Sequence, residues 1–221
     1  MLQYWDEYFT FGWESNQGPA QTEFFACVAL AGLPGPLRAL IRQQRLEILD
    51  WGCALGDALV QFARVFPESE LLGLDLSGVA VEKARLRHPQ LHFTTTPLNQ
   101  LGRQFAVVYT SNCLEHFDQP LEILRQEILA GVRDYLIILV PYLEINRCEG
   151  HLVTFDADSF PARLEDLTLL FRREIPTAAL PGSSWFGQQE LLVYARAQAC
   201  GLESLIPALQ SWQAARRPNR G

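Results

Sequence analysis

The chain has 221 residues, enough for one full-sized domain with a well-buried core. Hydrophobic residues make up 48% and charged residues 19%, which is typical of a globular protein and excludes an intrinsically disordered one. The 18 basic and 25 acidic residues leave a net charge of -7, so the surface would repel a phosphate backbone. Nucleic acid is therefore not expected as a substrate.

The five cysteines are widely spaced and include no CxxC pair, which argues against a disulfide framework or a structural zinc site. The N-terminus has no positive flank followed by an apolar run, so no signal peptide is predicted. No apolar stretch approaches the ~20 residues that a membrane span needs. We expect a cytoplasmic protein without a membrane partner, whose basic cluster Arg216-Arg217-Pro218-Asn219-Arg220 is a solvated tail.

Residues 1–45 are rich in aromatic side chains and are predicted to be helical, with breaks at Gly18-Pro19 and at 33–36. From Leu46 onward, short apolar runs alternate with helical patterns. Strands are predicted at 46–50, 71–75, 91–95, 105–110 and 135–140, and helices at 55–66, 78–87 and 120–130. The runs are nearly continuous in hydrophobicity, which indicates parallel strands covered on both faces.

The alternation ends after Val140. Residues 141–160 are expected to be an irregular insertion, with a helix near 157–166, a strand at 167–175 and a last strand at 190–195 that forms an antiparallel hairpin with it. The whole chain predicts a single α/β domain with a Rossmann-like, doubly wound, mostly parallel seven-stranded sheet and an antiparallel last strand. We divide it into an N-terminal helical cap (1–45), a cofactor-binding half (46–140) and a substrate-side half with the C-terminal tail (141–221).

A loop with two glycines follows the first strand, where an open α/β sheet binds its ligand. A dinucleotide fingerprint would need glycine or a near substitute at 52, 54 and 57; position 54 is alanine and position 57 is aspartate. We expect the Asp57 carboxylate to occupy the free N–H groups of the following helix and to cancel its positive end, which disfavours a pyrophosphate.

The run Asp50-x-Gly52-x-Ala54-x-Gly56 resembles motif I of the class I S-adenosylmethionine-dependent methyltransferases. Asp75, the segment 93–98 and the run Ser111-Asn112-Cys113-Leu114-Glu115-His116 resemble later motifs of that superfamily in the same order. The resemblance implies S-adenosyl-L-methionine as cofactor and S-adenosyl-L-homocysteine as product.

The chain departs from the family pattern at two places. Ala54 replaces the middle glycine of motif I, which we expect to be tolerated only with a negative φ. The acid usual after the third strand is absent and Pro97 stands in its place, so adenine recognition would rest on the Leu98 backbone or on a side chain such as Asn99.

Carboxylates at the ends of the first two strands have separate expected roles. Asp75 is expected to accept both ribose hydroxyls, with Ser77 as the N-cap of the next helix, while Asp50 organises the loop or binds the methionine ammonium. The residues expected to contact the cofactor are Asp50, Gly52, Cys53, Ala54, Gly56, Asp75, Leu76, Pro97, Leu98, Ser111, Asn112 and Gln21.

His116 and His151 are the candidate catalytic residues, each as a general base or as a substrate contact. Glu115 is expected to cap a turn, and His88 and His92 to be solvated. Trp5 and Trp13 could belong to a lid over the cofactor, although ordinary helix packing is the favoured role. The loop 183–188 exposes aromatic residues and could line a substrate pocket or a homodimer contact.

The favoured function is in-line methyl transfer to an oxygen or nitrogen of a small-molecule acceptor, a metabolite or a glycan precursor. No metal is expected, since no carboxylate cluster is evident in the sequence. The alternatives are an NAD(P)-dependent oxidoreductase and a catalytically silent methyltransferase-like binding domain.

Overall fold

An eight-stranded sheet forms the centre of the computed structural model, which describes residues 2–180 and 187–216. Its strand order is β3-β2-β1-β4-β5-β8-β7-β6. The parallel strands are β1 (Ile48–Trp51), β2 (Leu71–Leu74), β3 (His92–Thr94), β4 (Phe105–Ser111) and β5 (Val132–Tyr142). The antiparallel strands are β8 (Gln188–Arg196), β7 (Leu167–Pro176) and the two-residue β6 (Arg163–Leu164).

The predicted doubly wound, mostly parallel sheet with its antiparallel C-terminal hairpin is therefore confirmed. The eighth strand was not expected, because β6 is only two residues long. The predicted strand limits are confirmed to within a few residues, apart from β5, which begins earlier and ends later than the apolar pattern suggested.

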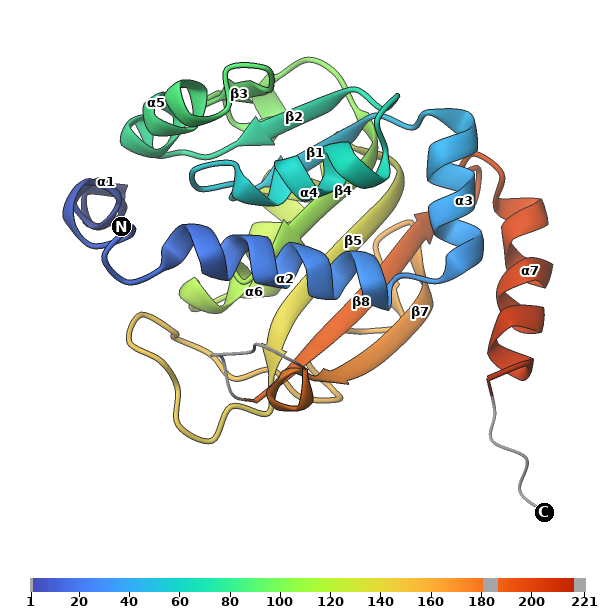
Figure 1. Cartoon of the computed structure of the whole chain (residues 1–221). Helices are drawn as coiled ribbons and strands as arrows, with labels where there is room; N and C mark the ends of the chain where they lie inside the picture. Colours follow the sequence, from blue (N-terminus) through green and yellow to red (C-terminus); the bar gives the residue numbers. More distant parts are fainter. Residues whose placement is uncertain (1, 181–186, 217–221) are drawn as a thin grey trace.

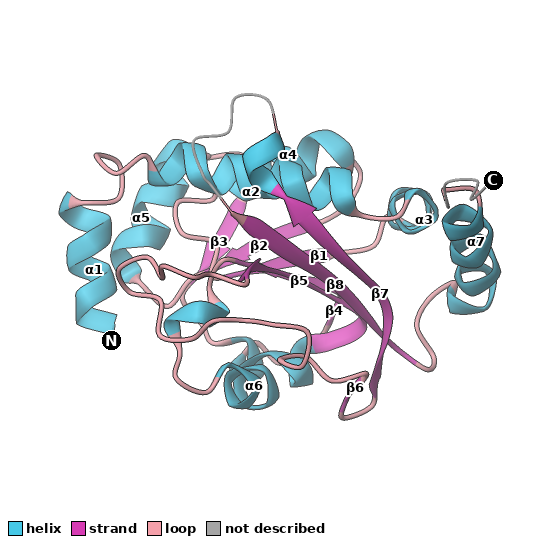
Figure 2. Ribbon diagram, turned by 90° about the horizontal axis from the view of Figure 1, so that it is seen from below, coloured by secondary structure: helices cyan, strands magenta, loops and turns pink. Residues whose placement is uncertain are grey.

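Helices cover both faces of the sheet (Figures 1 and 2). They are α1 (Leu2–Phe11), α2 (Gly18–Gly32), α3 (Gly35–Gln44), α4 (Asp57–Val65), α5 (Gly78–Arg87), α6 (Pro120–Ile123) and α7 (Leu202–Ala214). Successive residues of one strand enter opposite layers of the core. Ile48 packs among residues of α2, α3 and α4, whereas Leu49 packs with Leu124 and Ile128 after α6. This two-sided burial explains why the strands read as continuous apolar runs.

The segment predicted as one helix at 120–130 is helical but changes its pitch. α6 is followed by a π-helical turn at Leu124–Ile128 and a 3₁₀ turn at Leu129–Gly131.

The helix predicted near 157–166 is wrong. Ser159 Oγ donates to Asp156 Oδ1 over 2.7 Å, and the Asp158 N–H donates to the same oxygen over 3.1 Å. These short-range bonds hold the backbone in turns instead of a helix, and Pro161 has no N–H for a helical bond. The chain then enters β6 directly.

The C-terminal helix α7 is not among the predicted elements and lies in the region expected to form the substrate-side half and the C-terminal tail. It packs against α3 (Figure 1), and its apolar side chains Leu202, Leu205, Leu209 and Trp212 join the same core layer. Their spacing is helical, but Pro207 inside the pattern obscured it.

The N-terminal segment is helical, with breaks close to those predicted. α1 lies at the side of the molecule beside α5 (Figure 1), where the Lys83 ammonium donates to the Phe9 carbonyl over 2.7 Å and pairs with Glu14. In the part of the chain that the structure describes, no single helix has the length and apolarity of a membrane span; α2 and α3 meet that test only as a pair bent by 102°.

Two predictions concern segments largely outside the described residues. Residues 183–186 of the loop considered as a substrate pocket or dimer contact are among them, and so are residues 217–220 of the basic tail. Arg216 is described, and its guanidinium lies 4.1 Å from the centre of the Trp212 ring.

Candidate functional site

The loop after β1 has a left-handed backbone at three alternate residues. The φ angles are 78° at Gly52, 49° at Ala54 and 81° at Gly56. A Cβ at Gly52 would lie 2.6 Å from Cys113 Sγ, so glycine is required there by space as well as by conformation. The expected negative φ at Ala54 is wrong: this alanine adopts the glycine-like conformation at a cost of roughly 1–2 kcal/mol.

Asp75 explains how the loop holds that conformation. Its Oδ2 accepts the Ala54 N–H over 2.9 Å, and its Oδ1 accepts the Ser77 N–H over 2.9 Å. Ser77 in turn accepts the Ala80 N–H over 3.1 Å, so its predicted role as the N-cap of α5 is confirmed. Because each carboxylate oxygen has a second lone pair, Asp75 keeps acceptor capacity for ribose hydroxyls. Burial raises the pKa of Asp75 to about 6, against the opposing effect of the two N–H donors.

Asp50, on β1, lies below this loop and is only 3% exposed. Its Oδ2 is buried without a hydrogen-bond partner among the described residues. Burial and the neighbouring Asp75 raise the pKa of Asp50 to about 8. A cationic group placed here would pair with the orphan oxygen and stabilise the charged form of Asp50.

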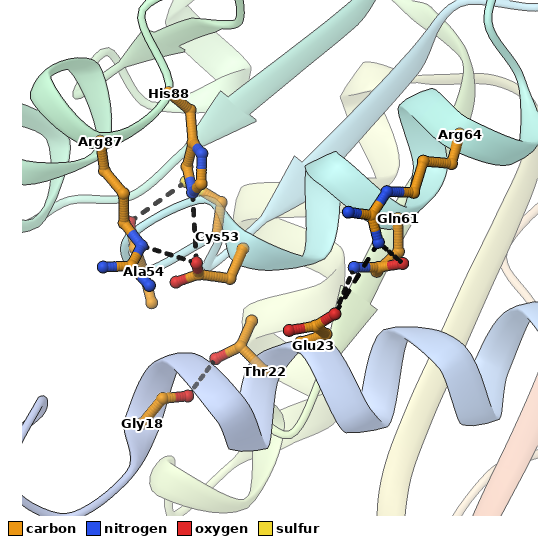
Figure 3. Close-up of polar contacts among 10 residues, drawn as sticks. Gly18, Thr22, Glu23, Cys53, Ala54, Gln61, Arg64, Arg87 and His88 are labelled. Atoms are coloured by element: carbon orange, nitrogen blue, oxygen red, sulfur yellow. Dashed lines mark hydrogen bonds and ion pairs between the residues drawn. The ribbon is translucent and has the colours of Figure 1, made fainter.

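Asp57, the first residue of α4, does not cap its own helix, so the expected role is wrong. Its Oδ1 accepts from Arg87 Nε over 2.7 Å and lies 3.2 Å from His88 Nε2. His88 is consequently not a solvated residue, whereas His92 is exposed as predicted. Figure 3 shows Arg87 and His88 reaching from the α5 side toward the loop.

The opposite side of α4 is fixed by α2. Gln61 donates to Glu23 over 2.7 Å and accepts from Arg64 over 3.0 Å, as Figure 3 shows. Thr22 donates its hydroxyl to the Gly18 carbonyl of its own helix over 2.9 Å. The predicted cofactor contact Gln21 is half-buried beside it.

The predicted adenine side of the site lies after β3. Pro97 precedes a 3₁₀ turn at Leu98–Gln100, and the Leu98 side chain is buried beneath Gly131. Asn99 is turned elsewhere, since its amide donates to the Gln126 carbonyl over 3.1 Å. Leu76, after β2, is 45% exposed and is free to contact a ligand through its side chain.

The end of β4 approaches the glycine loop through Cys113, whose side chain a Cβ at Gly52 would meet. Asn112 has a left-handed φ of 47° and donates its amide to Ser111 Oγ over 3.0 Å. Ser111 and Asn112 are both half-buried. The structure therefore brings the first motif and the motif after the fourth strand together at one edge of the sheet.

His116 and His151, far apart in sequence, lie side by side with ring centres 5.1 Å apart. His116 Nδ1 is 2.9 Å from the Gly150 carbonyl, and His151 Nδ1 is 2.7 Å from Glu144 Oε2. Both partners are acceptors, so each Nδ1 carries the proton and each Nε2 keeps a lone pair. Burial lowers the pKa of His116, which favours the neutral ring.

Glu115 does not cap a turn as expected. Its side chain is 0% exposed and neither carboxylate oxygen has a hydrogen-bond partner among the described residues. Its Oε1 lies 3.9 Å from His151 Nε2. Burial, with the Glu144 charge adding to it, raises the pKa of Glu115 to about 8.

Aromatic residues of α1 and of the turn after it lie over both halves of the site. Trp5 packs edge-on against His116 with ring centres 4.7 Å apart, while Phe9 and Trp13 pack with Ala54 and Leu55 of the loop. The favoured helix-packing role of Trp5 and Trp13 agrees with these contacts, and the same contacts make α1 a cover on the glycine loop. A separate shallow cavity of about 380 Å³ lies between the start of α6 and residues 153–159.

A parallel sheet that ends in an antiparallel hairpin, with a glycine loop after β1 and a carboxylate after β2, defines the class of protein. The fold is that of the class I S-adenosylmethionine-dependent methyltransferases. Residues 48–134 match the family described as a methyltransferase domain.

The comparisons with individual proteins agree with this assignment. Trans-aconitate 2-methyltransferase of Deinococcus radiodurans is 28% identical over 135 residues, which cover 60% of this chain. The match spans 52% of that protein, so the chain covers about half the length of this relative. A putative methyltransferase of Haloferax volcanii, solved with the Trm112 methyltransferase activator, has a TM-score of 0.62 at 16% identity, with 86% of this chain and 96% of that chain covered. The magnesium protoporphyrin IX methyltransferase of Synechocystis, solved with S-adenosylmethionine, has a TM-score of 0.52 at 16% identity. The match covers 81% of this chain and 80% of that chain.

Proposed function

We propose that the chain is an S-adenosylmethionine-dependent methyltransferase that acts on a small-molecule oxygen or nitrogen acceptor. The single observation that carries the proposal is the buried, partnerless Oδ2 of Asp50 beneath the glycine loop, with Asp75 beside it. An amino acid bearing an ammonium group, attached to a ribose, fits this pair of carboxylates. The cofactor supplies an activated methyl group on a sulfonium centre.

We propose a residue or backbone group for each part of the cofactor. Asp50 would pair with the ammonium, Asp75 would accept the ribose hydroxyls, and the backbone at Leu98 would face the adenine. Ser111 and Asn112 would bind near the sulfur end, where β4 stops. Phe9 and Trp13, packed on Ala54 and Leu55, would exclude water from this side of the site.

Methyl transfer mainly requires an acceptor held in line with the sulfonium, and good orientation contributes up to ~7–11 kcal/mol. A hydroxyl or protonated amine acceptor additionally needs a base. His116 meets the requirements for that base, since its Nδ1–H bond to the Gly150 carbonyl fixes the ring and leaves Nε2 free to take a proton. His151, held in the same way by Glu144, is the second candidate.

The proposed acceptor class rests on the net charge of the chain and on one relative. The net charge of -7 disfavours nucleic acid, and the Deinococcus radiodurans relative is named for methylation of a small organic acid. We therefore place a metabolite or glycan precursor first. All five cysteines are free in the structure, which supports our proposal of a reducing, cytoplasmic location.

Calorimetry with S-adenosylhomocysteine and with NAD tests the proposal. We expect the nucleoside to bind wild type, and Asp75→Ala to weaken it tenfold or more, because hydrogen bonds to a charged group are worth ~1.5–3 kcal/mol. Asp75→Asn keeps an acceptor for the Ala54 N–H and shows whether loop folding or ribose binding is lost, and the exposed Asp158→Ala is the matched control.

Two results would contradict the proposal in different ways. Tight NAD binding without nucleoside binding would favour an oxidoreductase. Nucleoside binding without methyl transfer to any acceptor in a broad metabolite panel would favour a catalytically silent binding domain.

A further inference from the structure

A cluster of two histidines and a glutamate lies where β4 and β5 end. Glu115, His116 and His151 each offer one ligand atom, and these atoms all lie within 4.8 Å of one another. The spacing comes from the fold, because Glu115 and His116 follow β4 whereas His151 belongs to the insertion after β5. The Leu152 N–H donates to the Glu115 carbonyl over 2.7 Å and fixes the insertion against this turn.

The Glu115 carboxylate is the independent sign of a missing partner. A buried carboxylate ordinarily accepts hydrogen bonds or pairs with a cation, and leaving one unpaired is costly. Glu115 is 0% exposed with both oxygens unpartnered, and one of them is 3.9 Å from His151 Nε2. That distance is too long for a hydrogen bond but leaves room for an ion between the two atoms.

The hydrogen bonds around the histidines are those that metal-binding histidines use. A ligating imidazole usually donates its other N–H to a backbone carbonyl or a carboxylate, which fixes the ring and the lone pair. His116 does this with the Gly150 carbonyl and His151 with Glu144, over 2.9 Å and 2.7 Å. Trp5 packs on the His116 ring and further limits its rotation.

We infer that Glu115, His116 and His151 form a binding site for a divalent first-row transition-metal ion such as Zn²⁺ or Co²⁺. Two imidazoles and one carboxylate suit these ions, whereas Mg²⁺ and Ca²⁺ prefer oxygen ligands. The three ligands would leave a coordination position open for water or an acceptor oxygen. A bound ion would occupy the Nε2 lone pairs, so in the metal-loaded chain neither histidine acts as the general base proposed above. The inference does not otherwise depend on methyl transfer.

A second group of residues competes for the same ion. Glu144, Cys148 and His151 also have ligand atoms within 4.8 Å of one another. Glu144 is already bound to His151 Nδ1, and Cys148 is exposed. The buried, unpaired Glu115 therefore favours the first group, in which Glu144 orients His151 without contacting the ion.

The sequence does not suggest a metal, because it has neither a CxxC pair nor an evident carboxylate cluster. His116 and His151 have 34 residues between them in the sequence, so only the folded insertion brings them together.

Equilibrium dialysis of chelator-treated protein with Zn²⁺, followed by elemental analysis, tests the inference. We expect one equivalent of Zn²⁺ per chain, a higher Tm with Zn²⁺, and much weaker binding of Mg²⁺. Glu115→Gln and His116→Gln should each weaken Zn²⁺ binding more than tenfold. The exposed His92→Gln is the matched histidine control and should leave binding unchanged.

Co²⁺ distinguishes the two groups of ligands by its visible spectrum. Binding at Glu115, His116 and His151 should give ligand-field bands without a thiolate charge-transfer band, and Cys148→Ser should not change them. His151→Gln serves as a further variant if Glu115→Gln does not fold, as judged by circular dichroism. Absence of stoichiometric binding to wild type, unchanged binding in folded Glu115→Gln or His151→Gln, or loss of the Co²⁺ spectrum in Cys148→Ser would each overturn the inference.

Discussion

Asp50→Asn is the most informative change at the proposed cofactor site, because it replaces one buried titratable carboxyl group with a neutral amide. Burial and Asp75 raise the pKa of Asp50 from 3.8 to about 8 in the folded chain. Between those values the folded state holds a proton that the unfolded state has released. The free energy of unfolding therefore falls as pH rises, by about 1.4 kcal/mol per pH unit from this group. We expect Asp50→Asn to remove that contribution.

Other groups facing Asp50 do not obscure the result. Burial raises the pKa of the Cys53 and Cys113 thiols and of the Tyr109 phenol, so these groups stay neutral in the range tested. Asp75 titrates in wild type and variant alike, with a pKa of about 6. The difference between the two proteins thus isolates Asp50.

Urea unfolding at pH 5, 6 and 7 measures the effect. The variant should gain roughly 3 kcal/mol relative to wild type between pH 5 and pH 7, at about 1.4 kcal/mol per unit. The exposed Asp158→Asn is the control and should follow wild type. Parallel pH profiles for wild type and Asp50→Asn would refute the argument that Asp50 is protonated in the free protein.

Binding of S-adenosylhomocysteine provides a second readout of the same group. An ammonium beside Asp50 favours its charged form, so complex formation at pH 7 should release about one proton. Calorimetry in buffers with different ionisation heats detects this proton. Asp50→Asn should bind more weakly and release none, whereas equal proton release would place the ammonium elsewhere.

The remaining predictions concern the loop and its cover. Gly56→Ala should lower the free energy of unfolding, measured in urea, by at least ~2 kcal/mol, since the φ of Gly56 is 81° and the new Cβ would lie 2.5 Å from the Phe93 ring. Gly78→Ala is the control and should not destabilise the chain, because the space around Gly78 is open. Ala54→Gly should change the free energy of unfolding by less than ~1 kcal/mol, because the relief of left-handed backbone strain is offset by the loss of a buried methyl group and by a more flexible unfolded chain. Stabilisation well above that value would contradict this balance. Lys83→Ala should cost ~1 kcal/mol and speed proteolysis within α1, and an unchanged cleavage rate would show that α1 is held by packing alone.

The parallel half of the fold was predictable because its signals are local. The apolar runs at β1, β2, β4 and β5 report strands that are mostly buried, and the helix at 78–87 carries its own N-cap in Ser77. The part after β5 was harder, since Asp156 and Ser159 form turns within a helix-like pattern and Pro207 interrupts the apolar spacing of α7. In both cases one local contact or one proline overrides the periodic signal.

The site divides in the same way. Motif spacing predicted the glycine loop and Asp75, which follow the consecutive strands β1 and β2 and are joined by the Ala54 N–H bond to the Asp75 carboxylate. The partners of Glu115 and His116 come from the insertion beyond β5, and Trp5 comes from the first helix. A single sequence does not show which distant segments lie side by side, so the burial of Glu115 could only be found in the structure.

The structure also changes the physical reason why the loop disfavours a pyrophosphate. Asp57 is paired with Arg87 and does not occupy the N–H groups of α4, so a guanidinium already offsets its charge. Asp50 and Asp75 instead place buried carboxylates beneath and beside the same loop. A pyrophosphate there would add negative charge next to both groups, whereas an ammonium would relieve the burial of Asp50. We therefore propose that selection for an amino-acid-bearing nucleoside rests on the two strand-end carboxylates and not on the residue that begins the helix.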